Sequence, residues 1–482
     1  MLALRRVITP SSRCLTRCHS SMQNSSTLGT VNSKKPAFWP ATAAEETVNN
    51  NQESSQRESE EFIFGKKRIG TVSLPRPLTI GIRNLLQGHD KPLIRTDALR
   101  IYQSLRSTAK PVTEDELKKF DIKPSTSDPH TLTYGLRESL AYIAGSMPIT
   151  YGALFNVIAE LQTRIPKFCP QSVLDFGTGP GTAIWAATEV YGDTLQKFVG
   201  VDKSEDMLRI AETLITSHPN PQKIEFQQYL PYNLKEKHDL VISSFTLGEI
   251  PTTSAQNSTL DALWNLTGDV LILIDRGTPA GFNKIVTARD YILRKAEKAN
   301  AFEEKEDENT EVSDAHVIAP CPHDRPCPMM NSKEWCHFSQ KVQRPDFTMR
   351  TKHSKINFED AKYSYVILRR GTRPQPNALS DMQTSSYSWP RLVFPPLKRN
   401  KHVVMDTCSQ SGNIERMVIP KSQGKTQYRD ARKSHWGDLF PWTPKKEPTL
   451  RNLKMVNSTS SSEKRQGKEE RNINRDINVE DL

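Results

Sequence analysis

The sequence of 482 residues lacks any apolar run that approaches the roughly 18 residues needed to span a bilayer. We therefore expect no membrane insertion. Hydrophobic residues make up only 36% of the chain, which is low for an enzyme that is compact throughout. This deficit predicts unstructured segments beside the folded parts, rather than a weak fold. A chain of this length predicts two or three folded units.

Acidic residues are absent before Glu45. The same segment carries Arg5, Arg6, Arg13 and Arg17 among apolar residues and serines, which is typical of a mitochondrial transit peptide. A secretory signal would need a continuous apolar core, which Arg5 and Arg6 interrupt. The sequence therefore predicts import into the mitochondrion, with the matrix as destination. The alternative is a basic tail without a targeting role.

Positive charge is concentrated in one part of the chain. Residues 341–440 hold 19 Lys and Arg against 8 Asp and Glu, which equals the whole net charge of +11. A basic region beside a neutral one indicates a polyanionic partner, of which RNA is the usual one. The alternative is a basic surface that serves solubility.

The periodicity of apolar residues changes along the chain. In 97–106, 136–144 and 151–164 they recur three and four apart, which predicts helices. From residue 172 onward, short buried strands alternate with helices, one of which is expected at 206–215. The strands are expected at 172–176, 198–202, 224–226, 239–245 and 269–275, with a later strand at 363–370. This alternation predicts an α/β fold with a doubly wound, mainly parallel, Rossmann-like sheet.

Composition and periodicity together predict five regions. They are a transit peptide and disordered linker (1–60), an N-terminal helical domain (61–165), an α/β core (166–300), a cysteine-rich, β-containing basic region (301–444) and a disordered tail (445–482).

A glycine-rich turn follows the first predicted strand. Asp175 ends that strand, and Gly177, Gly179 and Gly181 alternate before a helix. Glycines there allow a tight turn and close approach of a ligand. Asp202 ends the next strand, where an acid accepts hydrogen bonds from ribose hydroxyls. The alternative is a strand–turn–helix without a ligand.

The spacing of this turn is D-x-G-x-G-x-G, not the G-x-G-x-x-G of dinucleotide sites. It resembles motif I of the S-adenosylmethionine-dependent methyltransferases, which implies that cofactor and a methyltransferase-like core at 166–300. The candidate cofactor-binding residues are Asp175, Gly177, Thr178, Gly179, Gly181 and Asp202.

Signals for methyl transfer itself are sparse. Enzymes that methylate base amino groups carry Asn or Asp before Pro-Pro after the fourth strand, but this chain has Ser243-Ser-Phe-Thr-Leu-Gly-Glu there. The Cys nucleophile of pyrimidine-carbon methylation is also missing near the fourth and fifth strands. Glu249 and Asp275 stand at strand ends, where structural roles are favoured over general-base roles. The catalytic residues are therefore unassigned.

Three cysteines cluster in a proline-rich segment. Cys321, Cys327 and Cys336 are spaced C-x5-C-x8-C, and Cys408 follows in what we expect to be a loop. Four thiolates suit either zinc or an iron–sulfur cluster. The spacing lacks the close cysteine pairs of zinc sites and favours an iron–sulfur cluster, while zinc and free thiols stay open. Substitute ligands would be His323 and His337.

Several segments together resemble one family. They are 144–154 (AGSMPITYGAL), 321–328 (CPHDRPCP), 335–340 (WCHFSQ), 363–370 (YSYVILRR) and 436–441 (WGDLFP). The chain is similar, over about residues 90 to 445, to the mitochondrial methyltransferase-like protein 17 family of small-ribosomal-subunit assembly factors.

The resemblance implies a [4Fe–4S] cluster on Cys321, Cys327, Cys336 and Cys408. It also implies binding to the mitochondrial small ribosomal subunit and its rRNA during assembly, in support of mitochondrial translation. It leaves methyl transfer undecided, so an active S-adenosylmethionine-dependent rRNA methyltransferase is the alternative. The candidate RNA contacts are Arg369, Arg370, Arg429, Arg432 and Lys433 for phosphate and Trp436 and Phe440 for stacking.

Overall fold

The computed structural model describes residues 58–107, 133–230, 236–303, 315–377 and 380–455. The predicted transit peptide, with nearly all of the linker, and the tail beyond residue 455 lie outside the described residues. No single described helix is long and apolar enough to cross a membrane. The helix pair Leu136–Gly145 and Met147–Arg164, bent by 60°, passes the same test when taken together, which is weak evidence.

Helices form the N-terminal part of the structure. They are α2 (Glu60–Phe64), α3 (Arg76–Leu86), α4 (Lys91–Ser107), α6 (Leu136–Gly145) and α7 (Met147–Arg164). The three helices expected from periodicity fall within α4, α6 and α7. Helix α7 begins earlier than expected, because Pro148 fits the first turn of a helix.

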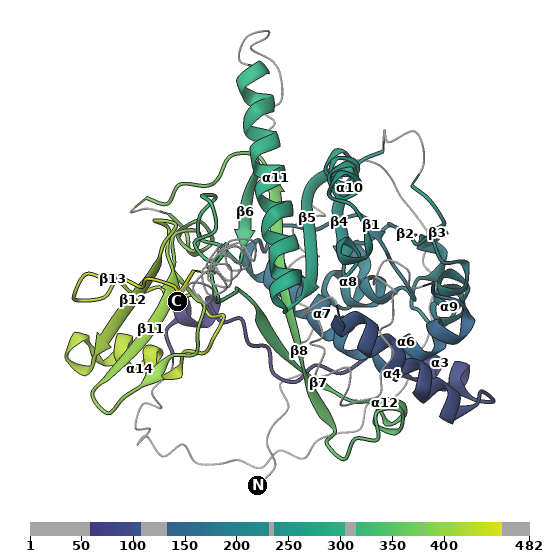
Figure 1. Ribbon diagram of the computed structural model, residues 1–482. Coiled ribbons are helices and arrows are strands. Elements are labelled where there is room, and N and C mark those ends of the chain that lie inside the picture. Colours follow the sequence, from purple (N-terminus) through teal and green to yellow (C-terminus); the bar gives the residue numbers. More distant parts are fainter. Residues whose placement is uncertain (1–57, 108–132, 231–235, 304–314, 378–379, 456–482) are drawn as a thin grey trace, which may run out of the picture.

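A large sheet forms the centre of the molecule (Figure 1). Its order is β3-β2-β1-β4-β5-β8-β6, and β7 also pairs with β8. The first five strands run parallel, whereas β8 runs antiparallel to β5, β6 and β7. The strands are β1 (Ser172–Phe176), β2 (Lys197–Val201), β3 (Ile224–Gln227), β4 (His238–Ser244), β5 (Thr267–Arg276), β6 (Ala315–Ala319), β7 (Phe338–Gln343) and β8 (Phe358–Arg370). The α/β fold is confirmed.

Helices cover both faces of this sheet, and central strands such as β4 are apolar on both sides. One face packs against α7 and α8, and the other against α10 and α11. Helix α9 begins at a Ser204 cap, whose side chain accepts from Met207 N, and buries one apolar face. The helices are α8 (Thr182–Tyr191), α9 (Glu205–Ile215), α10 (Thr253–Leu266) and α11 (Pro279–Glu303).

Strand β8 is long enough to pair with two strands along the same edge. Its first part pairs with β7 and its last part with β6, so that Tyr363 lies opposite Phe338 and Ile367 opposite Ala319. The chain between β6 and β7 therefore leaves the sheet beside the middle of β8. This loop carries Cys321, Cys327 and Cys336.

A second, smaller sheet lies beside this edge (Figure 1). It has the order β10-β11-β12-β13, with β9 also paired to β11, and it packs on α14 through Met405, Met417 and Ala431. The elements are β9 (Arg391–Leu392), β10 (Leu397–Lys398), β11 (His402–Cys408), β12 (Ile414–Pro420), β13 (Thr449–Leu450) and α14 (Lys425–Lys433). Of two further short helices, α12 (Asp346–Thr351) packs against α4 and α6, and α13 (Met382–Ser385) precedes β9.

Candidate functional site

The glycine turn between β1 and α8 has a left-handed backbone. Gly177, Gly179 and Gly181 have φ angles of 77°, 52° and 78°, which side-chain-bearing residues rarely adopt. A Cβ on Gly177 would lie 1.9 Å from Thr246 Oγ1, so no side chain fits there. A Cβ on Gly179 would meet no atom within 4 Å, which leaves space above the turn.

Asp202 follows β2 directly and fixes this turn. Its Oδ2 accepts from Gly179 N at 2.8 Å, and its Oδ1 accepts from Ser204 N at 2.9 Å. Burial raises the pKa of Asp202, although the two backbone N–H groups oppose that shift. Each carboxylate oxygen keeps a second lone pair for a ligand.

A pocket of about 740 Å³ opens above the turn, a size within the usual range for small-molecule sites. Gly177, Gly179 and Asp202 line it, whereas Asp175, Thr178 and Gly181 do not. We call it the glycine-loop pocket; its other walls include Tyr134, Tyr142, Lys203, Tyr229, Phe245, Glu249, Arg276, Asp360 and Lys362.

Asp175 lies beneath the turn rather than in the pocket. It is buried, its Oδ1 has no hydrogen-bond partner among the described residues, and burial raises its pKa to about 7. A carboxyl group in this state supports the turn from below, and the ligand-facing acid is Asp202.

Periodicity did not predict the far wall of the pocket. The Tyr134 hydroxyl donates to Glu249 Oε1 at 3.1 Å, and burial raises the pKa of Glu249. Glu249 therefore faces the pocket, although the sequence favoured a structural role for it. Asp275, the other strand-end acid, is buried and does not line the pocket.

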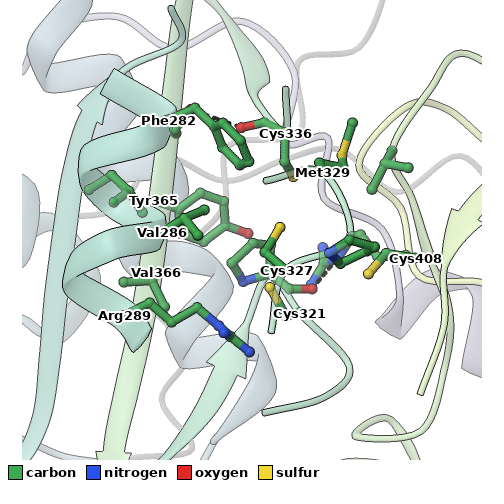
Figure 2. A pocket seen from close by; sticks show the side chains of 16 residues that line it. Phe282, Val286, Arg289, Cys321, Cys327, Met329, Cys336, Tyr365, Val366 and Cys408 are labelled. Atoms are coloured by element: carbon green, nitrogen blue, oxygen red, sulfur yellow. Dashed lines mark hydrogen bonds between the residues drawn. The ribbon is translucent and has the colours of Figure 1, made fainter. Parts of the chain in front are cut away.

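All four predicted cysteines line a second cavity, the cysteine cavity (Figure 2). Its other lining residues include Phe282, Val286 and Arg289 of α11, Ser364, Tyr365 and Val366 of β8, and Pro320, Met329, Arg391 and Val393. In Figure 2 the cysteine side chains lie between α11 and the second sheet. The fold therefore brings together residues that are far apart in the sequence.

The four cysteines come from a loop of the large sheet and from a strand of the second sheet. Cys321, Cys327 and Cys336 lie on the loop between β6 and β7, and the Ser364 hydroxyl holds that loop by donating to Cys336 O at 2.8 Å. Cys408 was expected in a loop, but it is the last residue of β11, where it pairs with Arg391 of β9.

Cys408 is buried, and the other three cysteines are half-buried. Burial raises the pKa of all four thiols, that of Cys327 to about 12, and neighbouring sulfurs raise those of Cys327, Cys336 and Cys408 further. Such thiols ionise only if a cation joins them. His323 Nε2 lies 3.3 Å from Cys408 Sγ, whereas His337 stacks on Trp335. Among the described residues, no group of three or more His, Cys, Asp and Glu side chains is arranged to hold a metal ion.

Two fully buried arginines hold the cysteine loop. Arg289 Nη2 donates to His323 O and Arg325 O at 3.0 and 2.8 Å. Arg391 Nε donates to Pro320 O at 3.0 Å. These bonds fix the backbone on both sides of Cys321 and bring two positive charges to the cavity wall.

The residues predicted to contact RNA separate into two groups. Arg369 pairs with Asp269 at 2.7 Å, and Arg370 donates to Thr267 O and Trp264 O, so both are engaged within the protein. The stacking role expected for Phe440 is wrong, because that ring is fully buried in the core of the second sheet. The exposed candidates are Arg432 and Lys433, while Arg429 and Trp436 are half-buried.

The strand order, the left-handed glycine turn and the acid after β2 define the fold of the S-adenosylmethionine-dependent methyltransferases. Residues 136–441 match the family model described as "Mitochondrial small ribosomal subunit Rsm22". The chain belongs to this family, and its relatives are named as mitochondrial proteins. The protein is accordingly mitochondrial.

Two relatives and one solved structure illustrate the similarity. "Ribosome assembly protein METTL17, mitochondrial" from Homo sapiens is 32% identical over 78% of this chain and 84% of its own length. "Ribosome assembly protein RSM22, mitochondrial" from Saccharomyces cerevisiae is 25% identical over 62% of this chain and 66% of its own. The solved structure of magnesium protoporphyrin IX methyltransferase from Synechocystis aligns with 56% of this chain and 100% of its own length, at 13% identity and a TM-score of 0.29. At these values the fold assignment rests on the strand order and not on this alignment.

Proposed function

We propose that this protein is an assembly factor of the mitochondrial small ribosomal subunit that binds rRNA, carries a [4Fe–4S] cluster and uses its methyltransferase fold as a scaffold. Its work in the matrix would support mitochondrial translation. The observation that carries the proposal is the convergence of Cys321, Cys327, Cys336 and Cys408 on one cavity beside the second sheet. Family relatives whose names describe ribosome assembly support it.

The donor set fits an iron–sulfur cluster better than zinc. The spacing C-x5-C-x8-C lacks the close cysteine pairs that are usual at zinc sites. An all-cysteine donor set is typical of iron–sulfur clusters. Cys321, Cys327, Cys336 and Cys408 would be the ligands, and a bound cluster would cross-link the β6–β7 loop to β11.

Anaerobic purification of the full chain tests this directly. We expect the broad visible absorption of a cysteine-ligated cluster, and iron and sulfide in near-equal amounts. Cys408→Ser should lose both, whereas Met329→Leu should keep them, because Met329 lines the same cavity without being a ligand. A colourless wild-type protein with stoichiometric zinc would remove the cluster from the proposal.

The glycine-loop pocket fits S-adenosylmethionine. The space above Gly179 admits the methionine part, and Asp202 retains lone pairs for ribose hydroxyls. When bound, this cofactor supplies an electrophilic methyl group. Calorimetric titration of the full chain with S-adenosylmethionine tests the fit, and Asp202→Ala should weaken the binding.

The second candidate function is an active rRNA methyltransferase. Glu249 and Tyr134 on the pocket wall favour it, because a half-buried carboxylate with a raised pKa is a candidate general base. Asp202→Ala should then abolish methylation of a specific rRNA nucleotide while RNA binding persists. If the modification persists in cells that carry only this variant, the protein is not the methyltransferase.

RNA binding is tested by its salt dependence. Each phosphate contact releases counterions, so we expect affinity to fall steeply between about 50 and 200 mM salt. An affinity that does not change over this range would contradict the rRNA proposal.

A further inference from the structure

Three exposed basic side chains lie together where the N-terminal segment meets the second sheet. We call Arg68, Lys398 and Arg432 the basic cluster. Burial and then the charge of Arg432 lower the pKa of Lys398; the buried Asp438 raises it, and Arg68 lowers it. After burial, Arg68 and Lys398 likewise lower the pKa of the neighbouring His435. Charges act on one another in this way only at short range, so the four side chains share one surface.

Three chain segments build this surface through specific bonds. Leu439 N donates to Gly65 O at 2.8 Å, and Lys67 N donates to Asp438 Oδ1 at 2.9 Å, which places Arg68 beside the chain after α14. Arg432 Nη1 donates to Arg399 O at 3.0 Å, which places α14 against the turn after β10.

No acidic side chain forms an ion pair with the basic cluster within the described residues. Within the described residues, no ion pair involves Arg68, Lys398 or Arg432, whereas their neighbours Lys66 and Lys433 both contact Glu58. The nearby Asp438 is buried, and its two oxygens accept from Lys67 N and His435 N. Three positive charges that have only the buried Asp438 near them repel one another, so an anion from outside the protein would stabilise the surface.

The chemistry favours phosphate groups over bases. Phe440 is buried, Trp436 is half-buried with its ring edge-on to His337, and the half-buried Tyr428 packs against the core of the second sheet. None of these three rings is fully exposed for base stacking, whereas all three basic side chains are exposed. Arginine and lysine alone recognise a phosphodiester backbone irrespective of its sequence.

We propose that Arg68, Lys398 and Arg432 form a binding site for the sugar–phosphate backbone of RNA. This inference rests on the proposed rRNA binding and assigns it to a surface. In this site, Arg68 of the N-terminal segment and Lys398 and Arg432 of the cysteine-bearing part would contact the same stretch of RNA.

The test compares two triple variants of the full chain. One is Arg68→Gln/Lys398→Gln/Arg432→Gln. The control, Arg83→Gln/Arg209→Gln/Arg350→Gln, removes the same charge from exposed arginines that are already paired with acids. The probe is a fluorescent RNA stem–loop of arbitrary sequence. At about 0.1 M salt the first variant should bind roughly five- to tenfold more weakly per lost residue, with a salt slope shallower by about one per residue.

The outcomes separate this site from the proposed function. If wild type binds no RNA, neither the stem–loop nor small-subunit rRNA, the proposed function fails. If the wild type binds RNA and both triple variants bind it with the same affinity as the wild type, the proposed site is wrong and the proposed function stands. If the first variant keeps its RNA affinity but loses binding to vesicles of acidic phospholipid, the surface is a membrane site and the inference is overturned. Matching melting temperatures exclude unfolding as the cause.

Discussion

Replacement of Glu160 by Gln is expected to destabilise the fold strongly, because this one carboxylate compensates two buried cations. Glu160 is 9% exposed, and it accepts from Arg391 Nη2 and Lys67 Nζ, each at 2.6 Å. The Tyr365 hydroxyl donates to the same group. Burial alone would raise the pKa of Glu160, but the charges of Arg391 and Lys67 lower it overall. The carboxylate is therefore ionised at neutral pH.

The size of the effect follows from what each cation does without its partner. Burial lowers the pKa of Lys67 to about 8, so Lys67 releases its proton when the carboxylate is gone. Arg391 stays charged, because a guanidinium does not lose its proton in proteins. The variant therefore carries one uncompensated buried charge, which costs about 3–5 kcal/mol of unfolding free energy.

Urea unfolding followed by tryptophan fluorescence measures this loss. The matched control is Glu189→Gln on α8, which is exposed and should change the unfolding free energy by no more than about 0.5 kcal/mol. A loss for Glu160→Gln below about 1 kcal/mol would refute the reasoning, because Arg391 and Lys67 would then not depend on Glu160.

Three further results are expected. The folded-state pKa of Glu160 lies below the ordinary value of 4.5, so the stability that its carboxylate contributes is complete above pH 4.5 and is lost as the pH falls further. The difference in urea midpoint between the wild type and Glu160→Gln should therefore narrow in acid. Gly177→Ala should abolish the binding of S-adenosylmethionine measured by calorimetry, because the new Cβ would collide with Thr246. The control Gly371→Ala carries the same backbone strain, at φ 92°, but its Cβ would lie in open space, so this variant should bind normally. Arg289→Gln should lower the iron content measured after anaerobic purification. The carbonyls of His323 and Arg325, in the loop that carries three of the cysteines, would lose the donor that holds them.

Elements that depend on nearby residues could be predicted from the sequence. The strand predicted at 172–176 coincides with β1, and the helix predicted at 206–215 differs from α9 by one residue. A short apolar run, a glycine turn and a serine cap specify these elements locally. The glycine turn was found for the same reason, since D-x-G-x-G-x-G contains all the residues that form it.

Long-range pairing could not be predicted from periodicity. Strand β8 joins β5 through a register that runs from Val270 opposite Arg369 to Arg276 opposite Tyr363, across the whole cysteine segment. The boundary predicted at residue 300 follows composition, and the large sheet continues across it. Buried polar groups are equally hidden: α7 reads as a helix with one apolar face, yet Glu160 is buried because its partners come from distant segments.

The cysteine cavity and the glycine-loop pocket share their supporting elements. On β8, residues 360–362 line the glycine-loop pocket, and residues 364–366 line the cysteine cavity. Similarly, residues 276–278 at the end of β5 line the pocket, and the first turns of α11, which follow directly, line the cavity. A group bound by the four cysteines would therefore fix the same strand and turn that shape the pocket. Packed elements of this kind can carry coupling between two sites, and such coupling acts equally in both directions.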